Sequence, residues 1–202
     1  MKKKVLIFGI TGQDGYYLCK ILRKSNYKIY GATRSKKNIK NPFKKEFSKT
    51  IEVSKTDITN YNQVLELVTK IKPNYIFNLT NISSIKYSYD NPINTFESIF
   101  NGNLNILQTI LKINKKIKYF SASSSEIFGD NLKGNVSEHT PLRPNNNYGL
   151  TKKNAFELVK YYRERFGIFC SSGILFNHES PIRGERYLPI SIIDNCILIE
   201  QK

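Results

Sequence analysis

The sequence of 202 residues predicts an α/β protein built on a doubly wound parallel sheet. Three observations lead to this fold class. Short, wholly apolar segments such as residues 5–8 are typical of central strands buried on both faces. Segments with helical periodicity separate these strands. A glycine-rich segment, residues 9–15, directly follows the first strand, where doubly wound sheets bind phosphate groups.

Strands and helices are expected to alternate along the chain. The strands are short apolar runs, and the helices repeat apolar residues three or four positions apart, as Val64, Leu67 and Val68 do. In chain order the elements fall at residues 5–8 (strand), 17–22 (helix), 27–32 (strand), 50–53 (strand), 62–71 (helix), 75–79 (strand), 95–114 (helix), 117–121 (strand), 148–166 (helix) and about 168–173 (strand). The basic stretch 38–49 and the polar stretch 130–147 are predicted to be exposed loops.

The chain carries a formal charge of +16, from 32 Lys and Arg residues against 16 Asp and Glu. A nucleic-acid surface would explain this excess, but the lysines are scattered, which favours solvated side chains and no nucleic-acid partner. The positive field still favours small anions such as nucleotides. No apolar run approaches the ~20 residues of a membrane helix, so no membrane partner is expected. Three widely separated cysteines without metal-ligand spacing indicate a cytoplasmic protein with no metal.

Residues 9–15 read Gly-Ile-Thr-Gly-Gln-Asp-Gly and join the first strand to its helix. Glycines there let the backbone turn sharply and approach a pyrophosphate, which free N–H groups at the helix N-terminus can bind. The spacing is GxxGxxG and not GxGxxG, so an ordinary glycine-rich turn is the alternative. The position between strand and helix favours a phosphate-binding loop.

The end of the second strand indicates which dinucleotide would bind. A cofactor with a free ribose 2′-hydroxyl usually meets an acidic residue about 20 residues after the glycines. Here the strand ends in Thr33, Arg34 and Ser35, with no acid. Arg34 would suit a 2′-phosphate and therefore predicts NADP, although a surface arginine in a basic protein is the alternative. Asp57 follows the third strand, where the adenine ring would lie.

Two further segments contain the candidate catalytic residues. Tyr148 and Lys152 form a YxxxK element at the start of a helix, where the spacing brings phenol and ammonium to one face. A nearby cation stabilises phenolate, so Tyr148 could act as a base. Ser124 and Glu126 follow the strand at residues 117–121 and could hold a substrate oxygen and move a proton. A serine-rich turn with a solvated glutamate is the alternative.

Taken together, these motifs resemble the extended short-chain dehydrogenase/reductase family. The resemblance rests on the phosphate loop, the Ser-Ser-Ser-Glu segment at 123–126, the YxxxK element and residues 173–184, which read Gly-Ile-Leu-Phe-Asn-His-Glu-Ser-Pro-Ile-Arg-Gly. The glycine loop and the Phe-Asn-His-Glu-Ser-Pro segment are similar to the GDP-mannose 4,6-dehydratase branch. The likeness covers about residues 3–187 and implies a Rossmann NAD(P)-binding fold.

The resemblance implies a reaction in which GDP-mannose becomes GDP-4-dehydro-6-deoxy-mannose. Tyr148 would take the proton of the sugar 4-hydroxyl as hydride passes from C4 to NADP⁺, and Lys152 would lower the pKa of that tyrosine. Glu126 would remove the C5 hydrogen while water leaves C6, and the hydride would return to C6. Ser124 would bind near the 4-oxygen. A related nucleotide-sugar epimerase or dehydratase is the neighbouring alternative.

The resemblance also implies two sets of binding residues. The cofactor would be bound by Tyr148 and Lys152 together with Gly9, Ile10, Thr11, Gly12, Gln13, Asp14, Gly15, Arg34, Ser35, Asp57, Ile58, Leu79, Thr80, Asn81, Ser83, Asn94, His178 and Arg183. The substrate would be bound by Ser83, Ser124, Glu126, Asn177 and Glu179. Residues 79–83 read Leu-Thr-Asn-Ile-Ser where the branch has Leu-Gly-Ala-Gln-Ser, so Thr80 and Asn81 place larger side chains beside the expected cofactor.

Residues 1–178 are expected to form the NADP-binding domain, and residues 179–202 a remnant of a sugar-nucleotide domain. Members of this branch are much longer, so most of that second domain is expected to be missing. A truncated, non-catalytic NADP-binding homologue that acts in assembly is therefore the second hypothesis. A basic nucleic-acid-associated protein is a third.

The resemblance implies a homo-oligomer whose helices at 95–114 and 148–166 pack across a dimer axis. Phe96, Ile99, Val159 and Tyr162 would form an apolar stripe at this interface. The alternative is that this stripe covers the sheet.

Overall fold

A computed structural model describes residues 2–35, 41–80, 85–130, 134–183 and 188–200. Six strands form one sheet in the order β3-β2-β1-β4-β5-β6, and every neighbouring pair is parallel. The strands are β1 (Lys3–Phe8), β2 (Tyr27–Thr33), β3 (Glu52–Lys55), β4 (Tyr75–Asn78), β5 (Lys118–Ala122) and β6 (Cys170–Gly173). The predicted doubly wound parallel sheet is confirmed.

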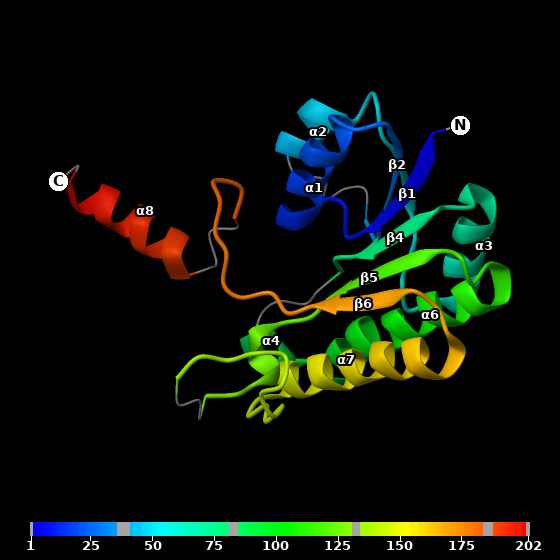
Figure 1. Cartoon of the computed structure of the whole chain (residues 1–202). Helices are drawn as coiled ribbons and strands as arrows, with labels where there is room; N and C mark the ends of the chain where they lie inside the picture. The colour runs from blue at the N-terminus through cyan, green and yellow to red at the C-terminus, as the bar shows by residue number, and fades with distance from the viewer. Residues whose placement is uncertain (1, 36–40, 81–84, 131–133, 184–187, 201–202) are drawn as a thin grey trace.

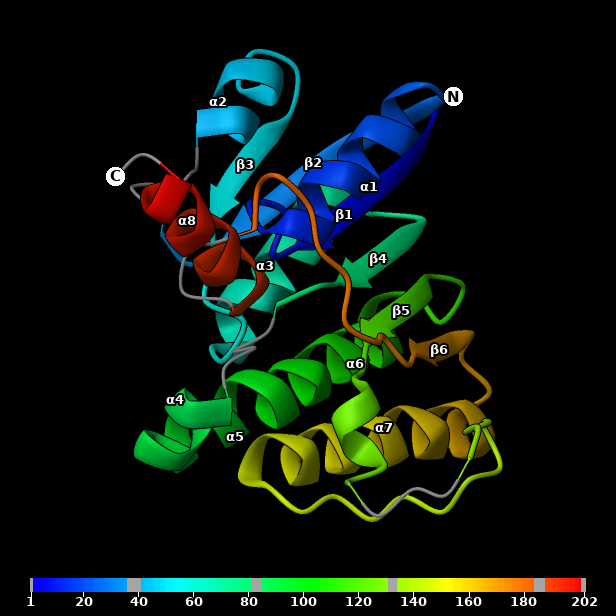
Figure 2. The same cartoon turned by 90° about the vertical axis from the view of Figure 1, so that its left-hand side faces the viewer.

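Helices cover both faces of this sheet (Figure 1). One face carries α1 (Gln13–Arg23) and α2 (Asn41–Phe47), and the other carries α3 (Tyr61–Ile71), α6 (Gly102–Ile113) and α7 (Asn147–Phe166). The short helices α4 (Ile85–Asp90) and α5 (Pro92–Phe96) lie beside the start of α7. A last helix, α8 (Leu188–Glu200), stands apart from the sheet in Figure 1 and lies nearest the viewer in Figure 2.

β1 shows why its sequence is wholly apolar. Val5 and Ile7 pack into the core under α1 and α2, whereas Leu6 and Phe8 pack into the core under α3, α6 and α7. Successive side chains of a strand point to opposite faces, so a strand with helices on both sides must be apolar at every position. All four side chains are buried.

The predicted exposed loop at 38–49 is wrong at residues 41–47, whereas residues 48 and 49 form an exposed turn. Residues 41–47 form α2, and Phe43 and Phe47 are buried with ring centroids 5.2 Å apart. Residues 38–40 lie outside the described part of the chain. The lysines of this segment occupy the outer side of a helix whose two phenylalanines, four positions apart, meet on the inner side. The loop was predicted from the basic composition, and the spacing of the two phenylalanines was not taken into account.

The predicted long helix at 95–114 is interrupted. α5 leads into a π-helical turn at Glu97–Asn101, and α6 follows directly. Of the predicted apolar stripe, Ile99, Val159 and Tyr162 are buried inside their own chain, and Phe96 alone is exposed. Val159 and Tyr162 share a core cluster with residues of the strands, as the alternative interpretation expects, whereas Ile99 packs with Tyr148 and Ala155 of α7.

Candidate active site

The glycine loop lies where the strand order reverses. β1 has β2 on one side and β4 on the other, so the segments that follow β1 and β4 diverge at this point, the usual ligand site of open α/β sheets. Gly9 has a φ of +78°, and a Cβ atom there would lie 2.7 Å from the carbonyl carbon of Leu79. A Cβ at Gly15 would overlap the carbonyl of Ile10. Both positions require glycine.

The same loop leaves the start of α1 available to an anion. Gly12 is the N-cap residue of α1 and supplies no side-chain cap for the first N–H groups of the helix. Gly12 N–H instead donates to the Gly9 carbonyl at 3.0 Å, which closes the turn. A glycine cradle followed by an uncapped helix N-terminus fits the diphosphate of a dinucleotide.

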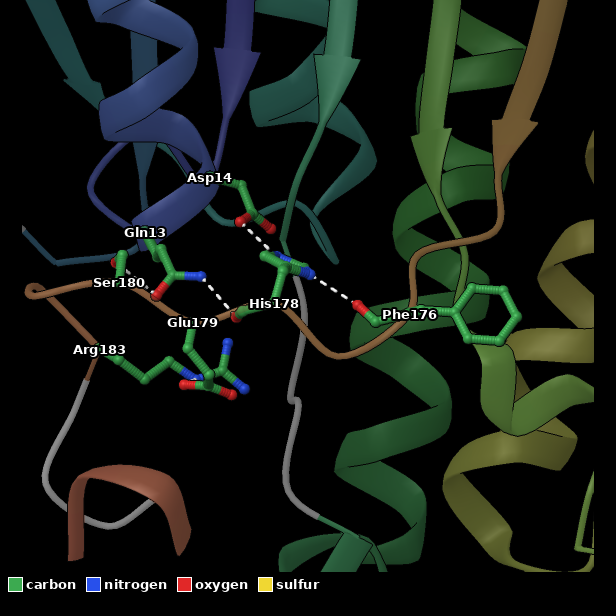
Figure 3. Close-up of polar contacts among 7 residues, drawn as sticks. All are labelled: Gln13, Asp14, Phe176, His178, Glu179, Ser180 and Arg183. Carbon is green, nitrogen blue, oxygen red and sulfur yellow. Dashed lines mark hydrogen bonds and ion pairs between the residues drawn. The ribbon is translucent and has the colours of Figure 1, made fainter. Parts of the chain in front are cut away.

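Residues 174–183, here called the strap, run from β6 back to this loop (Figures 1 and 3). The Gln13 side chain joins the two: its Nε2 donates to the His178 carbonyl at 3.1 Å, and its Oε1 accepts from Ser180 Oγ at 2.8 Å. His178 Nε2 lies 2.7 Å from Asp14 Oδ1. The structure thus brings together Gln13, Asp14 and His178, three residues of the predicted cofactor set.

The two predicted substrate residues of the strap lie at its surface. Asn177 and Glu179 are exposed, and Glu179 Oε2 lies 3.3 Å from Arg183 Nε. Figure 3 shows this pair at the opposite end of the strap from Phe176. Thr11 lies in the turn of the glycine loop and is partly buried.

The predicted residues after β2 and β3 differ in their surroundings. Arg34 is exposed at the end of β2, next to the partly buried Ser35. Asp57 Oδ1 accepts from Thr59 N and Oγ1 at 3.0 and 2.9 Å, which is a local turn contact. Ile58 is buried, and its side chain belongs to the core on the α3, α6 and α7 side of the sheet.

The segment after β4 is described only in part. Leu79 is partly buried against the α1 side of the sheet, and Thr80 N donates to Asn78 Oδ1 at 3.2 Å. The predicted site residues Asn81 and Ser83 lie outside the described residues. Asn94 lies exposed on α5.

A buried polar network holds the end of β4, and the sequence analysis did not identify it. The Tyr119 hydroxyl and Ser121 Oγ both donate to Asn103 Oδ1, and Asn78 Nδ2 donates to the Tyr119 hydroxyl at 3.3 Å. Asn78 Oδ1 in turn accepts from Thr80. A buried asparagine at the end of an otherwise apolar strand was the available signal, because such a group needs partners.

Tyr148 and Lys152 are both buried on the first turns of α7. Lys152 Nζ lies 5.7 Å from the centre of the Tyr148 ring and donates to the Ala122 carbonyl at 2.6 Å. Burial lowers the pKa of Lys152 to about 7, and the Asp14 carboxylate acts in the opposite direction. Lys152 can therefore gain or lose a proton near neutral pH, which differs from the permanent ammonium assumed from sequence.

Ser124 and Glu126 are joined to the start of α7. Asn146 Nδ2 donates to Glu126 Oε2 at 2.7 Å, while Asn146 Oδ1 accepts from Gly149 N at 2.7 Å. Ser124 Oγ accepts from Glu126 N at 3.3 Å and begins the turn Ser125–Ile127. A Cβ at Gly149 would overlap the Glu126 carbonyl, so the two segments are in close contact. The four predicted catalytic residues thus lie on two packed elements.

Asn146 was missed in the sequence analysis. An asparagine directly before a helix is the usual N-cap residue, and that rule identifies its cap contact. Its second contact, with Glu126, spans 20 positions and has no local signal.

A hollow of about 580 Å³ lies beside β6 and α7. Its lining includes Phe128, Phe156 and Arg163 but none of the four candidate catalytic residues. Among the described residues, no group of three or more His, Cys, Asp and Glu could hold a metal ion. No described helix is both long and apolar enough to cross a bilayer.

The chain has a Rossmann-type NAD(P)-binding fold of the short-chain dehydrogenase/reductase class. This class is indicated by the sheet order, the glycine loop and the Tyr148–Lys152 pair. The chain belongs to the GDP-mannose 4,6 dehydratase family, whose model matches residues 6–202. It is 34% identical over 198 residues to GDP-mannose 4,6 dehydratase 2 of Caenorhabditis elegans, covering 93% of this chain and 52% of that protein. It is 33% identical over 210 residues to GDP-mannose 4,6-dehydratase of Vibrio cholerae, covering 100% of this chain and 56% of that protein.

The chain therefore spans about half the length of these curated relatives. Among solved structures it is similar to DesIV, a dTDP-glucose 4,6-dehydratase of Streptomyces venezuelae, with a TM-score of 0.86 and 16% identity over 96% of this chain and 62% of that one. It is also similar to a dTDP-glucose 4,6-dehydratase of Bacillus anthracis, with a TM-score of 0.83 and 19% identity over 97% and 61% of the two chains. These two likenesses concern the fold.

Proposed function

We propose that the chain carries the cofactor site and the catalytic residues of a GDP-mannose 4,6-dehydratase that uses NADP. Family membership supports the reaction and the substrate. The observation that carries the proposal is the contact of Asn146 with both Glu126 and the first turn of α7, which holds a carboxylate beside the helix of Tyr148 and Lys152.

The glycine cradle and the start of α1 bind the cofactor diphosphate, and Arg34 pairs with the 2′-phosphate. The absence of an acid at the end of β2 supports NADP over NAD. A bound nicotinamide ring supplies a group that accepts hydride from the sugar and gives it back. Arg34 is exposed, so its guanidinium is open to a ligand.

The chain's own residues move the protons. Tyr148 accepts the proton of the sugar 4-hydroxyl, and the nearby Lys152, when protonated, stabilises the phenolate form of Tyr148. The resulting 4-keto group acidifies the hydrogen on C5, which Glu126 removes as water leaves C6. Asn146 holds one Glu126 oxygen, which leaves the other free to act. Ser124 donates a hydrogen bond near the 4-oxygen.

Formation of a dehydrated product tests this proposal. The chain is incubated with GDP-mannose and NADP⁺, and mass spectrometry follows a nucleotide sugar lighter by one water. We expect very slow product formation with the unaltered chain and none with Tyr148→Phe or Glu126→Gln, although all three proteins bind NADP⁺. NADP⁺ binding without product from the unaltered chain would favour the second candidate, a cofactor-binding protein that does not catalyse. The half-length match to the relatives is the observation behind that candidate.

We also propose that residues 1–178 act as the cofactor domain, that residues 179–202 belong to the sugar-nucleotide domain, and that the protein is cytoplasmic. None of the three cysteines, all of which are described, forms a disulfide, as in proteins of a reducing compartment. A homo-oligomer is supported by exposed apolar side chains on α5 and on the adjacent α7, namely Ile93, Phe96, Leu150 and Tyr161.

A further inference from the structure

Both ring nitrogens of His178 face hydrogen-bond acceptors (Figure 3). Nε2 lies 2.7 Å from Asp14 Oδ1, and Nδ1 lies 2.7 Å from the carbonyl oxygen of Phe176. A neutral imidazole has a single N–H and can donate to only one of these groups. The imidazolium ion donates to both. The geometry therefore favours the protonated ring.

Charged groups from three elements surround this ring. Asp14 lies in the first turn of α1 and contacts His178 directly. Glu179 and Arg183 lie on the strap and pair with each other at 3.3 Å. Lys152 of α7 interacts electrostatically with the same Asp14 carboxylate. Asp14 therefore lies between two groups that can each carry a positive charge.

The balance of these groups raises the pKa of His178. The hydrogen bond to the Phe176 carbonyl is the largest cause, and Asp14 adds to it through its hydrogen bond and its charge. Partial burial and the positive charge of Arg183 act in the opposite direction. The pKa of His178 is thus higher than that of an ordinary histidine.

Asp14 lies at the position where the diphosphate of the cofactor is expected. The uncapped N–H groups and the dipole of α1 attract an anion there, but the Asp14 carboxylate in the same turn repels it. Because the imidazolium of His178 contacts that carboxylate, it compensates the unfavourable charge. A neutral ring would leave the repulsion in place.

Resting on the proposed function, we propose that His178 couples dinucleotide binding to the uptake of a proton. The ring becomes fully protonated as the diphosphate binds at α1, so NADP⁺ binds more tightly as the pH falls. Linkage makes the effect reciprocal: the bound diphosphate stabilises the imidazolium as much as the imidazolium stabilises the diphosphate. His178 acts here as a positioning residue that also holds the strap against the phosphate loop.

Histidine NMR gives the most direct test, because the chain has only two histidines, His139 and His178. In His139→Gln a single histidine signal remains and reports His178 alone. We expect its titration midpoint to move to higher pH when the protein is saturated with NADP⁺ or ADP, and to stay unchanged with adenosine, which lacks phosphate. In Asp14→Asn the midpoint should move much less, because there is no carboxylate to compensate.

Affinity measurements provide the second readout. Calorimetric titration of NADP⁺ should give a dissociation constant roughly three- to tenfold larger at about pH 8.5 than at about pH 6. His178→Gln should lose most of this dependence, and His139→Gln should keep it. Lys152 titrates in the same range but is present in all three proteins, so the pH dependence lost in His178→Gln and kept in His139→Gln is attributed to His178. Titrations in buffers of different ionisation enthalpy should show proton uptake that His178→Gln reduces.

The outcomes separate this inference from the proposed function. If NADP⁺ binds with the same pH dependence in the unaltered chain and in His178→Gln, and the His178 midpoint does not move, the coupling is wrong and the cofactor site stands. If NADP⁺ does not bind at any pH, the cofactor site itself is wrong, and the coupling fails with it.

Discussion

Asn146 holds Glu126 and caps α7 with the two ends of one amide group. Its Nδ2 donates to Glu126 Oε2 at 2.7 Å, and its Oδ1 accepts from Gly149 N at the same distance. The position of the proposed C5 base relative to the helix of Tyr148 therefore depends on a helix cap. Changes that keep the cap but alter the other half of the amide can separate the two roles.

We predict that Asn146→Asp lowers dehydratase activity while stability stays nearly unchanged. Aspartate keeps an oxygen for the cap, but it removes the donor to Glu126 and places a second carboxylate beside it, and the two like charges repel each other. The rate of GDP-mannose dehydration at neutral pH should fall at least tenfold.

Asn146→Ala and Asn60→Ala form the matched pair for this prediction. Asn60 caps α3 by accepting from Gln63 N, away from the candidate site. Each alanine variant should lose about 1 kcal/mol in urea unfolding, but only Asn146→Ala should lose activity. Equal activity in the two variants would show that Asn146 has no role beyond its cap.

We predict that Lys152 makes folding stability rise with pH above neutral. The pKa of Lys152 is about 7 in the folded chain because the side chain is buried, against an ordinary value of 10.5. Between these values the unfolded chain holds a proton that the folded chain has released, so the free energy of unfolding increases with pH. Below about pH 7 both states are protonated, and the folded state bears the cost of a buried charge.

Urea unfolding of the unaltered chain and of Lys152→Met measures this contribution. The difference between them should change by roughly 2 kcal/mol in favour of the unaltered chain from about pH 7 to about pH 9. Lys160→Met, which removes an exposed lysine of the same helix, is the control and should track the unaltered chain. Parallel pH dependences for all three proteins would mean that Lys152 keeps an ordinary pKa.

Local patterns in the sequence were sufficient to predict the sheet and the glycine loop. Burial on both faces makes a strand such as β1 continuously apolar, and a turn that passes Leu79 this closely requires Gly9. Both constraints act within a few residues of chain. The same reasoning failed for α2, since composition outweighed the spacing of Phe43 and Phe47.

The contacts that define the candidate site were harder to predict because they join distant residues. His178 and Asp14 are separated by 164 positions, and either residue alone resembles a solvated side chain. The burial that lowers the pKa of Lys152 depends on how α7 packs against β5, which periodicity cannot quantify. The burial of Ile58 in the core likewise depends on packing between distant elements, which the local sequence does not show.

We predict that the chain self-associates through the outer surfaces of α5 and α7. Ile93 is 73% exposed and Leu150 is 49% exposed, and their helices are adjacent. Ile93→Asp combined with Leu150→Asp should shift the sedimentation profile towards monomer, because burying a carboxylate in an apolar interface is costly. Ile21→Asp, at an exposed isoleucine of α1 on the opposite face of the sheet, should leave the profile unchanged. A monomer at every concentration of the unaltered chain would exclude the dimer.

We predict that Arg34 selects NADP⁺ over NAD⁺. Arg34 is exposed at the end of β2, and no acid stands there to accept from a free 2′-hydroxyl. Paired hydrogen bonds from a guanidinium to a phosphate contribute about 2 kcal/mol. Calorimetric titration should therefore show that Arg34→Ala binds NADP⁺ at least tenfold more weakly, with little change for NAD⁺.

Arg165→Ala, at an exposed arginine near the far end of α7, controls for the loss of one positive charge and should leave both affinities unchanged. Equal affinity of the unaltered chain for the two cofactors would contradict the assignment of Arg34, and an equal loss of both cofactors in Arg34→Ala would assign it to the shared part of the dinucleotide.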